Sequence, residues 1–161
     1  MRINKHFSIE EFVTPRHVEV FGKSARWHIS DWQIETANLI RDVFDNRPMT
    51  INSWQWGGGL KNRGTRLPNS PIGSFYSQHK LAMAIDFNIE GYSSEECYKA
   101  LLSISHTLIN KGITTIESLD FTPEWIHLDG RYTGMDDLFI VKPRITTKGI
   151  DGIDSKFYYD L

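Results

Sequence analysis

Residues 77–88 read SQHKLAMAIDFN, and this stretch predicts a strand with one candidate functional residue before it and another within it. The strand is expected over residues 82–88, where the sequence becomes largely apolar. His79 lies at the junction with the preceding loop, whereas Asp86 lies within the strand. Side chains alternate between the two faces of a strand, so an odd offset of seven residues separates the faces of His79 and Asp86. They can meet at one site only if His79 precedes the regular pleat.

The region before this strand, residues 55–76, is predicted to be irregular. Glycine and proline recur throughout it, at Gly57–Gly59, Gly64, Pro68, Pro71 and Gly73. A loop of this length inside a compact domain is uncommon and usually functional. It also carries the basic residues Arg63 and Arg66 and leads directly to His79.

A second informative segment is Glu124-Trp-Ile-His127, which follows an expected turn at residues 120–123. On a regular strand Glu124 and His127 would again point to opposite faces. Pro123 is typical of a strand start or a turn, so we expect Glu124 on the turn and His127 on the strand. Asp129 shares the face of His127 and is either a rival ligand or a hydrogen-bond partner of that histidine.

Together the two segments supply the groups of a catalytic zinc site. Three protein ligands on Zn²⁺ leave a position for water, and a further carboxylate can act as general base. The sequence therefore predicts His79, Asp86 and His127 as ligands and Glu124 as the base. The alternative is that each is an ordinary hydrogen-bonded residue of a loop or strand end. The other histidines lack comparable carboxylate spacing: His6, His17, His28 and His106.

The remaining pattern predicts an α+β fold with a small antiparallel sheet and helices on one face. Capping boxes begin helices after Ser8, Ser30 and Ser93, and the last helix is expected to run to Gly112. Strands are expected at residues 49–54, 113–119, 125–128 and 138–141. We expect a single domain over residues 1–161, with a core of about residues 7–141. The tail, residues 142–161, should pack on the body through Phe157, Tyr158 and Tyr159.

Composition excludes several classes of function. The chain has 161 residues, 40% hydrophobic and 24% charged, which suits one compact soluble domain. Its net charge of −2 gives no general reason to bind nucleic acid. Cys97 is the only cysteine, so no intrachain disulfide is expected. No apolar run of roughly 18 residues predicts membrane insertion, and residues 1–7 lack the apolar core of a signal peptide. We therefore expect a protein made in the cytoplasm.

The two segments resemble a known family. Ser77-x-His79 with Ala84-x-Asp86, and Glu124-x-x-His127, are similar to the signatures of zinc D-Ala-D-Ala carboxypeptidases, dipeptidases and phage L-alanyl-D-glutamate endopeptidases. The segments at residues 7–12 and 52–54 also resemble the single-domain phage members, so the resemblance spans roughly residues 7–130. It implies a hedgehog/D-Ala-D-Ala-peptidase-like fold.

The resemblance also implies an activity. It implies a zinc peptidase that hydrolyses peptidoglycan stem peptides, as a phage endolysin or as a wall peptidase associated with virion proteins. Such an enzyme would reach the wall after release from the cell or with the particle. The same zinc ligands and base carry over, and Ser77 would position substrate. The alternative is a non-catalytic wall-binding or virion structural module that retains the fold.

Two positions depart from the family pattern. Ala82 replaces a glycine, which matters only if the backbone there requires a positive φ. The arginine that many members place at a strand end is absent from residues 52–55. Arg63 or Arg66 could replace it, and we favour Arg66. Both are equally well explained as solvated loop cations. The candidate substrate contacts are Arg63, Gln78, Trp54 and Trp125, with core packing as the alternative for the tryptophans.

Overall fold

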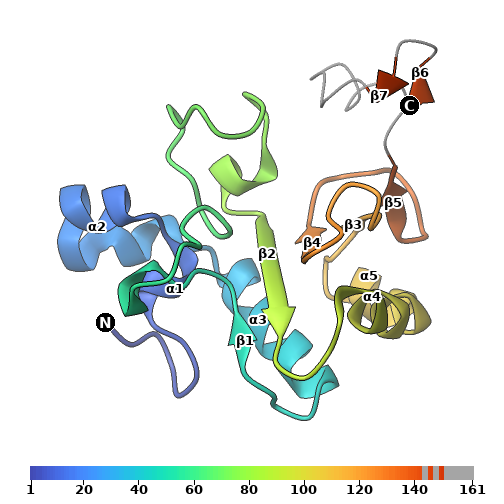
Figure 1. The fold of residues 1–161 in the computed structure, drawn as a ribbon, viewed down its shortest axis with the longest axis horizontal. Helices are drawn as coiled ribbons and strands as arrows, with labels where there is room; N and C mark the ends of the chain where they lie inside the picture. Colours follow the sequence, from blue (N-terminus) through green and yellow to red (C-terminus); the bar gives the residue numbers. More distant parts are fainter. Residues whose placement is uncertain (143–144, 147–148, 151–161) are drawn as a thin grey trace.

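The computed structural model describes residues 1–142, 145–146 and 149–150 (Figure 1). The α-helices are α1 (Ile9–Phe12), α2 (Pro15–Phe21), α3 (Asp31–Val43), α4 (Ser94–Ser103) and α5 (Ser105–Asn110), and the 3₁₀ helices are η1 (Gly22–His28), η2 (Trp54–Trp56) and η3 (Gln78–Leu81). The strands are β1 (Met49–Thr50), β2 (Ala84–Ile89), β3 (Thr115–Glu117), β4 (Ile126–Asp129), β5 (Phe139–Val141), β6 (Ile145–Thr146) and β7 (Gly149–Ile150). The expected packing of Phe157, Tyr158 and Tyr159 lies outside the described residues.

The main sheet has five strands in the order β1-β2-β4-β3-β5. The pairs β1–β2, β2–β4 and β3–β4 are antiparallel, but β3 and β5 are parallel. The sheet is therefore mixed, and the prediction of an antiparallel sheet was wrong for its last strand. The physical reason is the connection after β4, which crosses past β3 and lets β5 pair with the far edge of β3. Because β5 runs in the direction opposite to β4, and β3 is also antiparallel to β4, β5 is parallel to β3.

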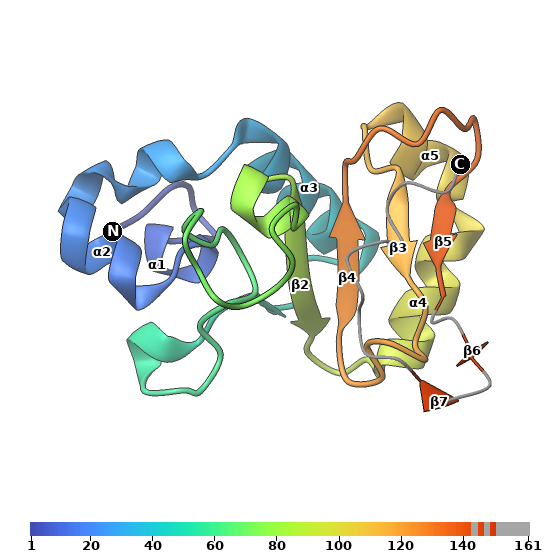
Figure 2. The same cartoon turned by 90° about the horizontal axis from the view of Figure 1, so that it is seen from above.

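The two faces of the sheet differ in chemistry. On one face Ile85, Phe87 and Leu128 are buried in the hydrophobic core. Helices α3, α4 and α5 lie behind this face, and η3 with the segment before it lies in front of the other (Figure 2). The front face carries Asp86 and His127, which alternate with those core residues along β2 and β4. Helices thus cover one face, as expected, and polar groups collect on the other.

The expected capping boxes are present. Glu11 accepts a hydrogen bond from the Ser8 backbone N–H at 2.7 Å, and the corresponding boxes begin α3 at Ser30 and α4 at Ser93. The helix expected to continue to Gly112 is instead divided into α4 and α5. The Ser103 hydroxyl donates to the carbonyl of Ala100 at 2.7 Å, a local bond that competes with continued helix.

Three further elements differ from expectation. The predicted strand at residues 49–54 is paired only over Met49–Thr50. Beyond it, the Asn52 side chain donates to the carbonyl of Val13 and accepts from the backbone N–H of Arg63. These bonds connect the chain to the N-terminal segment and to the long loop in place of a strand ladder. Helices α2 and η1 were not predicted.

Candidate metal centre

His79 lies on η3, immediately before the regular pleat of β2 begins. Between them Ala82 adopts φ 56° and ψ 31°, the left-handed conformation that favours glycine. Its carbonyl accepts a hydrogen bond from the hydroxyl of Ser30 at 2.5 Å. This turn directs the chain from η3 into β2, so the parity conflict between His79 and Asp86 does not arise. The Ala82 position is thus one that glycine would occupy without strain.

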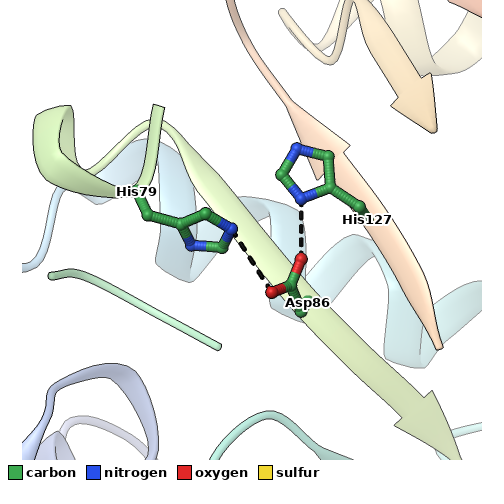
Figure 3. Close-up of side chains that lie close together, drawn as sticks. All are labelled: His79, Asp86 and His127. Carbon is green, nitrogen blue, oxygen red and sulfur yellow. Dashed lines mark hydrogen bonds and ion pairs between the residues drawn. The ribbon is translucent and has the colours of Figure 1, made fainter. Parts of the chain in front are cut away.

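Asp86 and His127 are direct partners in the β2–β4 register, so both side chains leave the same face of the sheet. His127 Nδ1 lies 2.6 Å from Asp86 Oδ1, and His79 Nε2 lies 3.3 Å from Asp86 Oδ2 (Figure 3). One ligand atom from each of the three residues lies within 4.8 Å of the others, and all three residues are buried. This cluster could hold a metal ion.

The second nitrogen of each histidine is bound to an acceptor outside the cluster. His79 Nδ1 lies 2.8 Å from the carbonyl oxygen of Gly64. A carbonyl only accepts, so Nδ1 carries a proton, and Nε2 is the atom that would bind a metal beside Asp86. His127 Nε2 lies 3.1 Å from Asp129 Oδ2. Such partners orient metal-binding imidazoles, so Asp129 has the position of a hydrogen-bond partner rather than of a ligand.

Electrostatics favour a cation at this position. Burial by itself would raise the pKa of Asp86, but His79 and His127 hold it well below its usual range. Burial opposes protonation of His127, yet Glu117, Asp129 and Asp86 raise its pKa well above 6.5. A site that retains a proton so strongly has a negative potential, and the same potential attracts a metal cation.

Arg66 lies beside the cluster. Its Nη2 atom is 3.5 Å from Asp86 Oδ2, its Nε donates to the carbonyl of Asn62 at 2.7 Å, and its side chain is 12% exposed. A Cβ added to Gly73 would lie 2.8 Å from Arg66 Nη1 and 3.3 Å from the Ser77 Cβ, so the long loop folds against both side chains. Burial lowers the pKa of Arg66, and Asp86 and Glu117 oppose that shift. Arg66 is therefore not a solvated loop cation.

The candidate substrate contacts have different environments. Arg63 hydrogen-bonds to Asn88 and lies over the ring of Trp125, 5.3 Å from its centroid. The Trp54 indole donates to the carbonyl of Val13 at 3.0 Å, which ties it to the N-terminal segment. Gln78 is half-buried on η3, next to His79.

Glu124 lies on the turn before β4, as the proline predicted, and its side chain is exposed. Its carboxylate is not part of the three-residue cluster, and its carbonyl accepts from Asn88 at 2.6 Å. The sequence did not single out Glu117, although its Oε1 lies 3.9 Å from His127 Nε2. Alternation along the expected strand, residues 113–119, shows only that Glu117 and Thr115 point to the same face of that strand. Only the pairing of β3 with β4 brings that face to the site.

Searches against protein-family models, curated proteins and solved structures found no match. Within the described residues, no helix is both long enough and apolar enough to cross a bilayer. The molecule therefore combines a mixed α+β fold with a buried cluster of two histidines and one aspartate that could hold a metal ion.

Proposed function

We propose that this protein is a zinc-dependent peptidase of the D-Ala-D-Ala carboxypeptidase type, with a hedgehog-like fold. The proposal rests on the convergence of His79, Asp86 and His127 within 4.8 Å. Two imidazoles and one carboxylate form a donor set typical of catalytic Zn²⁺, which keeps one position open. The acceptors behind both histidines support the same assignment, because they orient the rings toward a common point.

The chain's own groups suit peptide hydrolysis. When bound, Zn²⁺ supplies a Lewis acid that polarises a carbonyl and lowers the pKa of water. Arg66 stabilises negative charge that develops on the carbonyl oxygen, since its guanidinium lies against Asp86. Glu124 takes a proton from the attacking water and returns it to the leaving nitrogen as the C–N bond breaks. Ser77, beside Arg66, positions the substrate.

The proposed substrates are peptidoglycan stem peptides, on the basis of the Ser-x-His, Ala-x-Asp and Glu-x-x-His motifs. Arg63 bonds to Asn88, which shares the β2 face of Asp86, and stacks on Trp125, so this pair is proposed to contact a bound peptide. Gln78 and Trp54 are proposed as further contacts. A phage endolysin, or a wall peptidase carried with virion proteins, is the setting that we propose for this activity.

One observation favours a second candidate function. The Glu124 carboxylate is exposed and stands apart from the cluster, as it would in a wall-binding or virion structural module that has lost turnover. Such a module would bind zinc and peptidoglycan without releasing peptides.

The decisive experiment combines metal content with digestion of purified cell-wall sacculi. We expect about one zinc per chain and release of soluble peptides or free amino acids. Glu124→Ala should retain zinc and fold but lose hydrolysis, whereas Glu90→Ala, which removes an exposed carboxylate at the far end of β2, should retain both. Zinc binding without product from any wall type would identify the binding module. Full activity of Glu124→Ala would eliminate this residue as the base.

A further inference from the structure

Glu117 occupies a position on the site face that neither the motifs nor the proposed mechanism uses. The register pairs Ile116 with Leu128, and its continuation places Glu117 opposite His127. Glu117, His127 and Asp86 therefore form one row across three adjacent strands, on the same face of the sheet. The Glu117 side chain is 20% exposed, so it borders the site at the surface.

The carboxylate of Glu117 lacks a close partner. Among the described residues it accepts no hydrogen bond, and its one ion-pair contact is His127 Nε2 at 3.9 Å. That nitrogen already lies 3.1 Å from Asp129, which is itself bound by Arg131. Arg66 is the other cation that acts on Glu117, but among the described residues it lies beyond ion-pair distance from this carboxylate. A largely buried carboxylate in this situation favours a cation or donor from outside the chain.

The two ends of the row carry opposite charges. Arg66 contacts the cluster at Asp86, through Asp86 Oδ2 at 3.5 Å, and Glu117 contacts it at His127. A substrate that lies along the row would place its carbonyl or carboxylate toward Arg66 and a positive group toward Glu117. Hydrogen bonds to charged groups are among the strongest available for recognition.

We propose that Glu117 binds a primary ammonium group of the substrate close to the scissile bond. This inference rests on the proposed peptidase function and adds that the enzyme selects peptides with a free amine. The amine could be the α-amine of a short peptide or the side-chain amine of a diamino acid. Both present the same ammonium chemistry, and the experiment separates them.

The test uses the zinc-loaded full chain and the stem pentapeptide L-Ala-D-Glu-L-Lys-D-Ala-D-Ala. Four forms are compared: both amines free, only the α-amine acetylated, only the side-chain amine acetylated, and both acetylated. Equilibrium dialysis at low temperature, with intact peptide quantified by mass spectrometry, measures affinity, and a separate assay measures cleavage. A free amine should improve affinity about tenfold over the doubly acetylated form. The singly acetylated form that keeps this advantage identifies the amine.

Glu117→Gln should abolish the advantage without changing the affinity of the doubly acetylated peptide, and Glu117→Asp should restore part of it. Glu90→Gln is the matched control and should behave like the native chain. Equal affinity of all four forms, no binding of any form, or an advantage that survives Glu117→Gln would overturn the proposal. Amine-dependent binding without cleavage would refute the peptidase and retain the ammonium site. Cleavage without amine preference would support the peptidase and refute the ammonium site at Glu117.

Discussion

Two histidine pairs of nearly equal spacing have opposite properties in this molecule. The rings of His79 and His127 are 5.1 Å apart, and those of His17 and His28 are 5.2 Å apart. Asp86 lies between the first pair, and the pKa of His127 is raised. The second pair packs with Phe21, and burial, with a smaller contribution from His28, lowers the pKa of His17 to about 4. Neighbouring carboxylates, rather than the proximity of two imidazoles, distinguish the cluster that could hold a metal ion.

The largest expected effect comes from removing the central carboxylate. Asp86→Asn keeps the shape of the side chain but removes its charge, so zinc affinity should fall by more than about 100-fold, the upper range for loss of an outer-shell partner. Competition with a chromogenic chelator measures this. His28→Ala, in the other pair, should leave affinity unchanged. Equal losses in both variants would show that the triad is not the metal site.

The next largest effect is the change in melting temperature on metal removal, which should depend on Asp86 but not on His17. Zinc bound only to the folded chain stabilises it by about 2.7 kcal/mol at a free concentration 100 times the Kd. Chelation should therefore lower the melting temperature of the native chain and of His17→Gln equally. Asp86→Asn should melt at the same temperature with and without chelator. A chelator-sensitive Asp86→Asn would indicate a different metal site.

Acid should act through the His17 pair. The folded pKa of about 4 lies below the ordinary value of 6.5. Between these values the unfolded chain binds a proton that the folded chain excludes, so stability decreases as pH falls through this window. His17 should contribute a loss on the order of 2 kcal/mol between pH 7 and pH 5, and the raised pKa of His127 acts in the opposite direction.

Urea unfolding of the chelated chain at both pH values measures this loss, and His17→Gln supplies the comparison. Glutamine cannot titrate but can still accept from Thr14, whose backbone N–H and hydroxyl lie 3.3 and 2.9 Å from His17 Nδ1. The variant should lose about 2 kcal/mol less than the native chain. An equal loss would mean that His17 is protonated in the folded state.

The smallest effect concerns the turn that presents His79. Ala82→Gly should stabilise the chain by about 0.5–1 kcal/mol, because the left-handed conformation strains alanine but not glycine. Ala84→Gly, inside β2, should destabilise it by a similar amount. The free energy of unfolding in urea provides the measurement. A destabilising Ala82→Gly would show that the turn relaxes away from φ 56° in solution.

Local patterns predicted much of the fold and of the site. The capping boxes located the starts of α1, α3 and α4, and strand parity required His79 to precede β2 and Glu124 to lie on a turn. These features depend on residues a few positions apart, whose geometry is set by the backbone itself. The division of α4 from α5, near the bond from the Ser103 hydroxyl to the carbonyl of Ala100, is not revealed by periodicity.

The sequence by itself determined which metal-binding groups are available, namely two histidines and one aspartate. It also showed that they can share one site if His79 precedes the strand of Asp86 and a turn precedes the strand of His127. Only the tertiary structure decided which other side chains lie next to these three residues. The strand order β2-β4-β3 placed Glu117 beside His127, and the loop anchored at Gly64 brought Arg66 to Asp86. Strand partners are selected by burial of apolar faces over the whole chain, and that choice is not encoded in any short segment.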